Sequence, residues 1–517
     1  MKSLIRGLTI LLVLLMLLPS VISCKNNKGN TDVESTESDV AEDSETVIEY
    51  DDKGYQKDNL GMQDFGGKEI RILGWKDAPF KEFDLDYKEV EGTPLGQAVY
   101  NRNMKVEHRM NVSLKYNLVP GNNSNRSNYI KEVETALADR SVDGFACYSM
   151  CATSLMLQGY VLDLKTMDYL DFDAPWWSRG IIESSSLYDR VYFGTGSIAP
   201  SLLGETYVMY YNKAMADVYL RQELDALGAE TLYDLVDDGR WTVDNFIRLA
   251  KTVTISGITK TENDTYGYVT IGAGYDSWYF ASNMSTLDNA EDGSLQISDD
   301  WGSSKTQELA DKLLGFFSGS SAGAAYGDVS VAASFMNGTA LFRNDALSRL
   351  PNMAQTQPVG ETGVGVLPMP MWDEDQNDYV SIPGFGFTLY SIARSSDRKD
   401  EIAATIECLA SEGYRLTEPN LYEVLLKARS TDGEGSADDR RMMDLVRDSI
   451  YIDSGRIHND GIGGFGWKMF RSSIQEDLTA GNPNSTYASF YATNKDTVKS
   501  KLDIINTSIL NIEEIYS

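Results

Sequence analysis

Apolar and polar residues follow one another along the chain in a pattern that predicts strands interleaved with helices. Glu69–Trp75 is a short, mostly apolar run, and Val112–Val119 alternates apolar and polar residues as a half-buried strand does. Thr93 as cap and Pro94 in the first turn predict the start of a helix. Further strand patterns are found at 142–148, 207–211 and 364–369, and further helical patterns at 129–140, 305–317, 397–413, 438–451 and 495–516. Strands that alternate with helices favour an α/β fold built on parallel sheets with helices on both faces.

The last helical pattern has a packed face rather than the character of a membrane segment. Its apolar residues recur at helical spacing between polar ones: Val498, Leu502, Ile505, Ile509 and Ile512. We therefore expect this helix to cover the core of a domain.

The N-terminus has the parts of a secretory signal. Lys2 and Arg6 precede an apolar run at 8–18, which Pro19 ends. A bilayer is spanned by ~20 apolar residues, so this run is short for a membrane helix. The cysteine after Ser23 resembles a bacterial lipobox, which implies that residues 1–23 are removed and that Cys24 carries a lipid. The alternative is an uncleaved membrane anchor in which Cys24 is incidental.

Residues 24–60 are predicted to form a disordered acidic linker behind the lipid. Ten acidic residues and no basic residue occur between positions 31 and 52. Such a segment buries too little apolar surface to offset the entropy lost on ordering. The acidic run could instead bind a basic partner or calcium.

The remaining residues, 61–517, are enough for two domains of ordinary composition, with 42% hydrophobic and 24% charged residues over the whole chain. The net charge of −31 argues against nucleic acid as a partner and against direct contact with anionic lipid. The chain is rich in rings, with 29 tyrosines, 17 phenylalanines and 8 tryptophans. Most of these rings will be core, but they also suit a site that stacks on flat ligand faces.

The cysteine and histidine counts restrict the chemistry. After Cys24 only Cys147, Cys151 and Cys408 remain, so no disulfide framework is expected. Cys147 and Cys151 could form a local bridge, half a metal site, or two separate thiols. With His108 and His458 as the only histidines, a zinc site or a histidine relay is not favoured, and we expect no metal and no cofactor.

Several short motifs together carry a family resemblance. They are found at 65–75, 142–144, 159–164, 335–342 and 366–370, and Tyr211-Asn212-Lys213 at a strand end is the most specific of them. With the lipobox and the acidic spacer, residues 64–517 resemble the extracellular solute-binding proteins of family 1, the maltose-binding-like receptors of bacterial ABC importers.

The resemblance implies a periplasmic-binding-protein-like fold, in which two α/β lobes are joined by a hinge and a ligand cleft lies between them. Lobe 1 would comprise residues 61–207 and 384–435. Lobe 2 would comprise residues 208–383 and 436–517. A ligand would be trapped as the lobes close.

The resemblance also places candidate ligand-binding residues. A sugar offers apolar faces and a rim of hydroxyls, so its site needs aromatic rings and side chains that make paired hydrogen bonds. Glu205 lies where maltose-binding relatives have a ligand carboxylate, and Trp467 and Arg471 match an aromatic–arginine pair. The full set is Trp75, Asp77, Tyr148, Ser149, Glu205, Tyr275, Trp278, Arg343, Asn344, Trp467 and Arg471. For each of these residues the alternative is core packing or plain solvent exposure.

The pattern also departs from the maltose-binding relatives. Cys147 stands where a ring is expected, and the region around Phe342 lacks a tryptophan, which argues against maltodextrin as the ligand. Trp241 resembles a helix-entry residue of the family and is assigned a structural role. Trp176 and Trp177 fit either the cleft or the core.

Motifs for catalysis lack the structural context that they need. Gly319-Ser-Ser-Ala-Gly323 matches a nucleophile elbow, but a helical pattern precedes it instead of a strand. Gly461–Gly466 matches a dinucleotide fingerprint without a preceding strand, and we interpret it as a loop that presents Trp467 and free helix N–H groups to the cleft. Residues 373–378 have calcium-like spacing but lack the required glycine and glutamate.

The sequence therefore predicts a monomeric, non-enzymatic receptor held by lipid on the extracellular face of the bacterial membrane. It would capture a carbohydrate and deliver it to the permease subunits of an ABC importer. The alternatives are a surface glycan hydrolase, a receptor for a peptide or another solute, and a sensor input.

Overall fold

The computed structural model describes residues 48–253, 264–318, 323–324, 331–354, 363–427 and 437–516. The predicted signal peptide, Cys24 and most of the acidic linker lie outside the described residues, as do positions 319–322 of the Gly-Ser-Ser-Ala-Gly pattern. Two mixed sheets, of four and five strands, organise the described part of the chain.

The first sheet has the strand order β11-β3-β1-β2. Its members are β1 (Lys68–Trp75), β2 (Val112–Val119), β3 (Gly144–Tyr148) and β11 (Thr388–Ile392). β1 runs parallel to both β2 and β3, whereas β11 is antiparallel to β3. Ile70 and Ile72 of β1 are almost fully buried, as their apolar pattern predicts. The strand predictions at 69–75 and 112–119 are confirmed, and 142–148 is confirmed from residue 144 onward.

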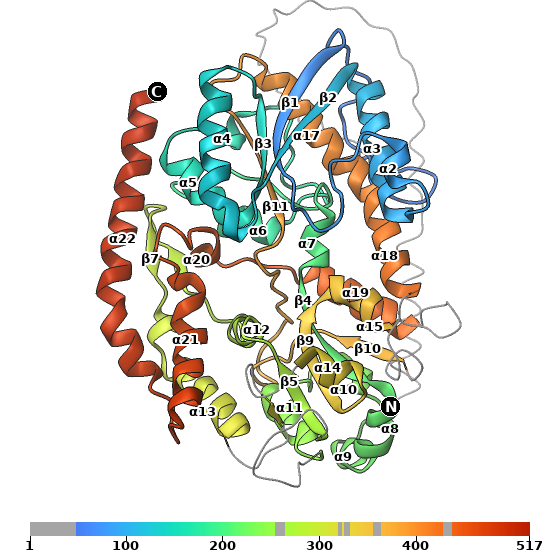
Figure 1. Ribbon diagram of the computed structural model, residues 1–517, viewed down its shortest axis with the longest axis vertical. Helices are drawn as coiled ribbons and strands as arrows, with labels where there is room; N and C mark the ends of the chain where they lie inside the picture. The colour runs from blue at the N-terminus through green and yellow to red at the C-terminus, as the bar shows by residue number, and fades with distance from the viewer. Residues whose placement is uncertain are drawn as a thin grey trace, which may run out of the picture. The chain divides into compact units, whose positions relative to one another are not determined.

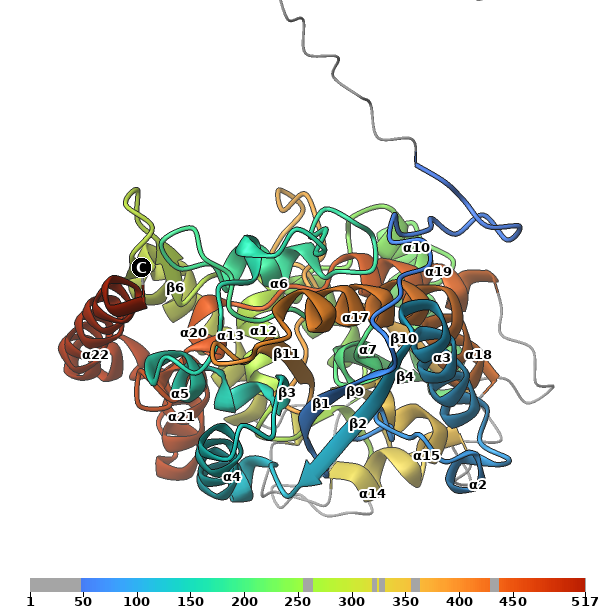
Figure 2. The same cartoon turned by 90° about the horizontal axis from the view of Figure 1, so that it is seen from above.

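The first two crossover helices lie on opposite sides of this sheet (Figures 1 and 2). α3 (Pro94–Met110) connects β1 to β2, and α4 (Arg126–Ala138) connects β2 to β3. Thr93 occupies the N-cap of α3 with Pro94 in its first turn, as predicted, although Thr93 makes no side-chain cap bond. α17 (Lys399–Glu412) packs against both α3 and β11.

The second sheet has the strand order β10-β4-β9-β5-β8. Its members are β4 (Tyr207–Asn212), β5 (Tyr266–Thr270), β8 (Gly323–Ala324), β9 (Ala340–Ala346) and β10 (Val364–Leu367). β4 is antiparallel to β9 and β10, and β5 is parallel to β9 and β8. The prediction of parallel sheets is therefore correct only in part, since each sheet combines parallel and antiparallel pairs. In the first sheet, β11 joins only after the chain has passed through the second sheet, and it enters from the opposite direction.

Three segments pass between the two sheets side by side. Residues 205–207 pair with residues 382–384, since Tyr207 N donates to Ile382 O at 2.8 Å and Gly384 N donates to Glu205 O at 2.7 Å. Ser381 is also bonded to the segment after Asp448, with Ser381 N donating to Ser449 O at 3.0 Å. These backbone pairs form the hinge between the sheets.

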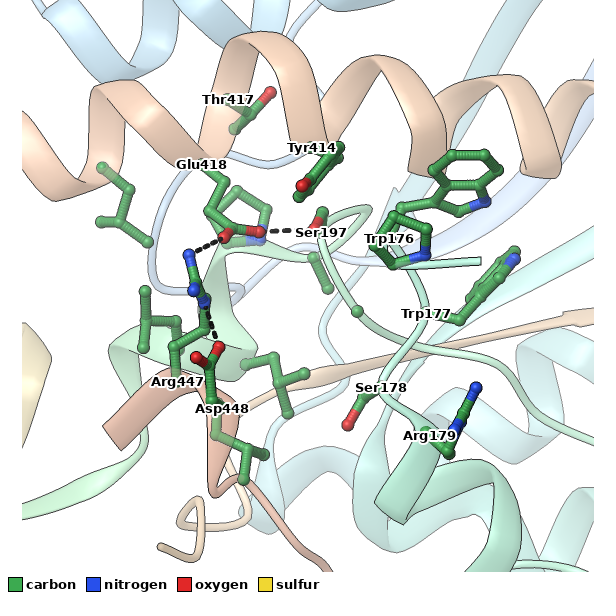
Figure 3. A pocket seen from close by; sticks show the side chains of 18 of the residues that line it. Trp176, Trp177, Ser178, Arg179, Ser197, Tyr414, Thr417, Glu418, Arg447 and Asp448 are labelled. Carbon is green, nitrogen blue, oxygen red and sulfur yellow. Dashed lines mark hydrogen bonds and ion pairs between the residues drawn. The ribbon is translucent and has the colours of Figure 1, made fainter. Parts of the chain in front are cut away.

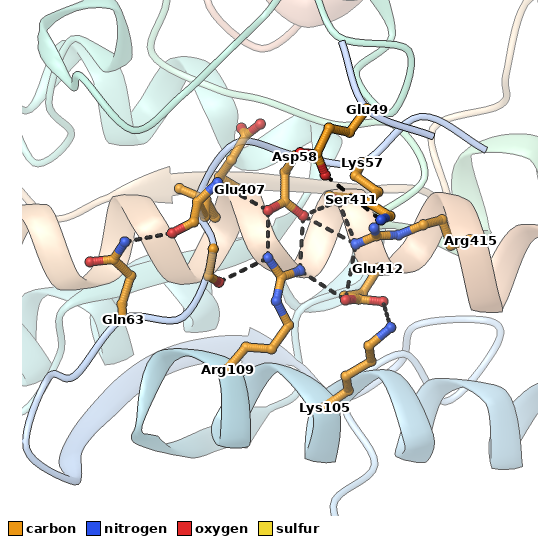
Figure 4. Close-up of polar contacts among 12 residues, drawn as sticks. Glu49, Lys57, Asp58, Gln63, Lys105, Arg109, Glu407, Ser411, Glu412 and Arg415 are labelled. Carbon is orange, nitrogen blue, oxygen red and sulfur yellow. Dashed lines mark hydrogen bonds and ion pairs between the residues drawn. The ribbon is translucent and has the colours of Figure 1, made fainter. Parts of the chain in front are cut away.

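The segment before β1 is fixed to the first sheet's helices by a buried charge network (Figure 4). Arg109 of α3 binds Asp58 and also Glu412, with Arg109 Nη1 2.8 Å from Glu412 Oε1. Arg415 Nη2 lies 3.1 Å from Asp58 Oδ2 and 2.9 Å from Glu412 Oε1. Because both carboxylates are buried and each faces two guanidinium groups, the network ties residues 55–60 to the fold.

The remaining helices cover the sheets and the hinge. Around the first sheet and the hinge are α2 (Tyr87–Val90), α5 (Ala152–Leu157), α6 (Arg179–Ser184), α7 (Pro200–Gly204) and α18 (Glu418–Lys427). Those that follow β4 are α8 (Lys213–Tyr219), α9 (Arg221–Leu227), α10 (Leu232–Asp237), α11 (Val243–Ala250), α12 (Gly274–Ala281), α13 (Ser304–Ser318), α14 (Val331–Met336), α15 (Leu350–Ala354), α19 (Ala437–Asp448), α20 (Ser454–Ile457), α21 (Phe465–Ala480) and α22 (Tyr487–Tyr516). A small hairpin joins β6 (Leu287–Asn289) to β7 (Leu295–Ile297).

The C-terminal helix α22 packs as its apolar spacing predicts. Val498, Leu502, Ile505 and Ile509 are buried, and the helix contacts α5, α13, α21 and β7. Among the described residues, no helix has both the length and the apolar character needed to cross a membrane.

Candidate functional site

A cavity of about 380 Å³ lies where the end of β3 faces the start of α21. Tyr148 and Met150 reach it from the end of β3, Arg126 from the start of α4, and Phe385 from the hinge segment. Asn123 reaches it from just before α4, and the rest of its lining comes from residues 459–471. In open α/β sheets, ligands bind beyond the carboxyl ends of the parallel strands, which is where this cavity lies.

Three rings line the cavity: Tyr148, Phe385 and Trp467. Trp467 is only half-buried, so part of its ring remains accessible. The guanidinium carbon of Arg471 lies 4.5 Å from the Trp467 ring centroid, and that of Arg456 lies 4.0 Å from the Phe385 centroid. These contacts hold the rings in place and give the cavity apolar surface beside polar groups.

A buried carboxylate holds the two arginines. Asp276 of α12 accepts a hydrogen bond from Arg471 Nε at 2.9 Å and a second bond from Arg471 Nη2. Arg456 Nη1 also donates to Asp276, at 3.1 Å. Burial, and then repulsion from Arg471, lower the pKa of Arg456 in spite of its Asp276 partner. One carboxylate therefore serves two guanidinium groups.

A second ion pair crosses the cavity. Arg126, in the first turn of α4, donates to the Asp460 carboxylate from the loop before α21. Among the described residues that line the cavity, Asp460 is the one carboxylate. A glycoside hydrolase needs two positioned carboxyl groups, so this lining does not supply that arrangement.

Asn459 lines the same cavity and has an unusual environment. The residue is 1% exposed, yet neither its Nδ2 nor its Oδ1 has a hydrogen-bond partner among the described residues. An unpaired buried amide costs about 1–3 kcal/mol of stability. Its neighbour His458 is also buried, and burial lowers the pKa of that imidazole to about 4, so it is neutral at pH 7.

Glycines shape the start of α21. Gly464 is the N-cap with φ of 84°, a conformation that favours glycine, and no side chain caps the helix. A Cβ on Gly466 would lie 1.9 Å from the carbonyl oxygen of Gly455, so only glycine lets α21 approach α20 this closely. The first N–H groups of a helix have no intrahelical acceptor. The interpretation of residues 461–466 as a loop that leads into a helix and presents Trp467 is consistent with this geometry.

Of the residues proposed from the sequence to bind ligand, Tyr148, Trp467 and Arg471 line the cavity. Trp75 lies behind Tyr148, with ring centroids 5.1 Å apart, and its Nε1 donates to Thr388 Oγ1 at 2.8 Å. Ser149 is buried beside the cavity, and its Oγ donates to Phe385 O at 2.7 Å.

Asp77 and Glu205 lie outside the cavity lining. Asp77 accepts hydrogen bonds from the backbone N–H groups of Gly121 and Asn122, at 3.0 and 3.1 Å, and so holds the loop before α4. Glu205, on the hinge, accepts a bond from Ser348 Oγ at 3.0 Å. Burial raises the pKa of Glu205.

The four other candidates are packed in the core around the second sheet. Trp278 is fully buried and donates from Nε1 to Tyr268 OH at 2.8 Å, and Tyr275 is fully buried on the same helix. Arg343 is bonded to Asp345 on β9, and Asn344 accepts from Tyr268 OH at 2.8 Å. Residues 272–278 do not form a glycine-rich turn that carries these rings, because α12 begins at Gly274, where a Cβ would clash with Thr270.

Several residues that line the cavity were not among the candidates: Asn123, Arg126, Met150, Phe385, Asn459, Asp460 and Lys468. The polar run Asn459-Asp460 directly before the glycine loop is the sequence signal that could have indicated two of them. Arg126 and Phe385 carry no such signal.

A second cavity of about 300 Å³ lies beside the hinge (Figure 3). Three of its charged groups are paired with one another, since Arg447 binds both Glu418 and Asp448, and Glu418 also accepts from Ser197 Oγ. Trp176 and Trp177 line it, and their Nε1 atoms donate to the buried Glu407 at 2.8 and 2.9 Å. These two tryptophans therefore serve the core.

The cysteines and the acidic groups do not form a metal site in the described part of the chain. Cys147, Cys151 and Cys408 are buried free thiols. No group of three or more histidine, cysteine, aspartate or glutamate residues is placed to hold a metal ion among the residues that were searched.

No protein-family model and no curated protein matches this chain. Solved structures do match its fold. The galacto-N-biose/lacto-N-biose I-binding protein of an ABC transporter from Bifidobacterium longum, in complex with lacto-N-biose, aligns with a TM-score of 0.53 at 13% identity and covers 86% of this chain and 99% of that one. UgpB from Mycobacterium tuberculosis, in complex with glycerophosphocholine, aligns with a TM-score of 0.50 at 13% identity and covers 85% of this chain and 98% of that one.

At this level of identity the comparison establishes the fold. The chain has the two-lobe α/β fold of these binding proteins, in which a hinge joins the lobes. The fold that the sequence resemblance implies is confirmed.

Proposed function

We propose that this chain is a family 1 extracellular solute-binding protein that captures a carbohydrate between its two lobes and does no chemistry on it. The observation that carries the proposal is the cavity between the end of β3 and the start of α21. It combines the half-buried Trp467 ring with the unpaired amide of Asn459. A sugar presents an apolar face to a ring and hydroxyl groups to polar side chains, and this cavity offers both kinds of surface.

Its size also suits a small saccharide. Ligand pockets have volumes of about 300–1,000 Å³, and this one, at about 380 Å³, lies at the lower end of that range. In this fold the lobes rotate about the hinge, so we expect the pairing of residues 205–207 with residues 382–384 to persist while the cavity closes around the ligand.

The cellular setting belongs to the proposal as well. Cys24 would carry the lipid, residues 24–60 would hold the monomeric receptor away from the outer face of the membrane, and the permease subunits of an ABC importer would receive the sugar. Deletion of permease genes adjacent to this one should abolish uptake of the bound sugar, and the absence of any such genes would favour the sensor alternative.

A binding screen tests the receptor itself. The chain without residues 1–23 is mixed with oligosaccharides, its thermal unfolding is followed, and the sugar is analysed afterwards. A ligand at 100 times its Kd stabilises a protein by about 2.7 kcal/mol, which gives a clear shift in Tm. We expect stabilisation with the sugar intact. Cleavage of the sugar would support the glycan hydrolase instead, and stabilisation by peptides alone would support the other-solute receptor.

A further inference from the structure

The lining of the cavity has a net positive charge, opposite in sign to that of the whole protein. The whole chain has 46 basic and 77 acidic residues. Among the described residues that line the cavity, three are cationic and one is acidic: Arg126, Lys468, Arg471 and Asp460. With three cations and one carboxylate in its lining, the cavity has a local field that attracts anions, although the protein as a whole is strongly acidic.

The acidic groups nearby neutralise only part of this positive charge. Asp460 is taken by Arg126, and Asp276 is shared between Arg456 and Arg471. The Lys468 Nζ donates to the Gly463 carbonyl at 3.3 Å, and no described carboxylate lies within ion-pair distance of it. Among the described residues, the ammonium group of Lys468 and one of the two guanidinium charges on Asp276 are therefore left without an anionic partner.

Uncompensated charge at a half-buried position is costly unless an anion arrives to pair with it. Lys468 lies in the first turn of α21, where the positive end of the helix dipole adds potential of the same sign. The buried amide of Asn459, with neither atom paired, lines the same cavity. It can accept from one hydroxyl and donate to another. A neutral ligand would use the amide and the ring but would leave the charges unpaired.

We infer that the ligand is an acidic saccharide. Its anionic group is bound by Lys468 and Arg471 at the start of α21, and its hydroxyls are bound by Asn459 while a ring face packs on Trp467. The inference rests on the proposed function, because it specifies the class of sugar that the same cavity takes. The shared chemistry is a saccharide anion, which a uronic acid carboxylate or a sulfate ester supplies.

The test uses ligands that differ only in charge. Panels of uronic acid oligosaccharides and of sulfated oligosaccharides are titrated calorimetrically, each beside its carboxyl-reduced or desulfated counterpart. A hydrogen bond to a charged group contributes about 1.5–3 kcal/mol, so the neutral counterpart should bind about 10- to 100-fold more weakly. Whichever panel holds the tighter ligand identifies the anion. Its affinity should also fall as the salt concentration rises.

A matched pair of variants locates the effect. Lys468→Met keeps the length of the side chain and removes its charge. It should lower the affinity for the acidic ligand about tenfold or more and leave the affinity for the neutral counterpart unchanged. Lys499→Met makes the same charge change at an exposed position of α22 and should leave both affinities unchanged.

Each contrary outcome overturns a distinct statement. If the neutral counterpart binds as tightly as the acidic ligand, the inference of an acidic saccharide is wrong and the proposed receptor function stands. If inorganic sulfate or phosphate alone binds as tightly as the acidic saccharide, the site is an anion site and the inference fails. If no saccharide of any panel binds, the proposed function fails with it.

Discussion

The Arg471 guanidinium carbon lies 4.5 Å from the centroid of the Trp467 ring, and Asp276 accepts hydrogen bonds from the same guanidinium group. The two residues are four positions apart on α21, so their side chains lie on one face of the helix. The carboxylate fixes the arginine and the arginine supports the ring. The ring is thereby positioned before any ligand arrives, which lowers the ordering cost of binding.

Trp467 should contribute to binding through the area of its ring. Trp467→Ala should weaken ligand binding by about 1–3 kcal/mol. Trp467→Phe should weaken binding less, since stacking depends on buried apolar area. Calorimetric titration measures both. Trp278→Phe is the control, because that ring is fully buried in the core and its loss should lower Tm rather than affinity. Unchanged affinity in Trp467→Ala would remove the ring from the site.

Membrane attachment should depend on Cys24 alone. Cys24→Ser removes the thiol that would accept the lipid, so the protein should move to the aqueous fraction with its ligand affinity unchanged. Cell fractionation followed by immunoblotting reports the distribution. Persistent membrane association of the variant, with residues 1–23 still removed, would contradict the lipobox prediction.

The Asp58 carboxylate should stabilise the folded protein at pH values above the ordinary pKa of an aspartate. Burial acts to raise the pKa of Asp58, but hydrogen bonds from Arg109 and Ser411 prevail and lower it to about 2. Because the folded-state pKa lies below the ordinary value of 3.8, the stabilisation is present above pH 3.8 and is lost as the pH falls toward 2. Asp58→Asn leaves two buried guanidinium groups with Glu412 alone and should lower the free energy of unfolding at pH 7 by about 3 kcal/mol.

The control for this prediction is Asp52→Asn, which removes an exposed carboxylate from the same segment. Urea denaturation of both variants at pH 7 and at pH 3 measures the difference. Equal stability of the two variants at pH 7 would mean that the network around Asp58 does not hold the segment.

Glu407 should make the protein less stable as the pH rises toward 8. Burial raises the pKa of Glu407 to about 8, although Trp177 and Trp176 donate hydrogen bonds to its carboxylate. The folded state therefore holds the proton more tightly than the unfolded state does. This stabilisation is complete below the ordinary value of 4.5 and is lost as the pH rises through about 8.

Glu407→Gln keeps the shape and cannot titrate. Between pH 6.5 and 8, the wild type should lose stability relative to this variant by about 1 kcal/mol per pH unit. Denaturant titrations at several pH values give the slopes. Parallel curves for the two proteins would show that the carboxyl group does not change its protonation on unfolding in this range.

The sequence predicts the parts of the fold that depend on local pattern. The strand β1 and the helix start at Thr93-Pro94 follow from residues close together in the chain. β9 shows no such pattern because Arg343, Asn344 and Asp345 interrupt it. The side chain of Asn344 is satisfied by partners distant in the sequence, such as Tyr268 and Thr270. A strand of this kind becomes visible only once those partners are placed.

The same distinction applies to the site. Trp467 and Arg471 can be paired from sequence because one helix carries both. Tyr275 and Trp278 have the residue types of a sugar site, but contacts from β5 and α11 bury Trp278. Arg126 and Asp460 are 334 positions apart, and no spacing rule connects them. Residue type alone does not show whether a ring lies in the cleft or in the core. The burial of each ring in the folded protein does.

Asn459 gives a prediction in which stability and binding change in opposite directions. Its amide atoms have no hydrogen-bond partner among the described residues, and such a group costs about 1–3 kcal/mol when buried. Asn459→Leu replaces the amide with an apolar side chain of comparable size. It should therefore raise the free energy of unfolding without ligand by about 1 kcal/mol.

The same change should weaken ligand binding, because it removes the amide donor and acceptor that would bond the hydroxyls of the ligand. We expect a loss of about 1–3 kcal/mol for a site built to bond a hydroxyl. Denaturant unfolding of the free protein and calorimetric titration with the ligand measure the two effects separately. If Asn459 only supported the loop before α21, the Asn459→Leu protein would lose both stability and ligand affinity. A gain in stability with a loss of affinity is expected only if the amide is kept unpaired for a ligand.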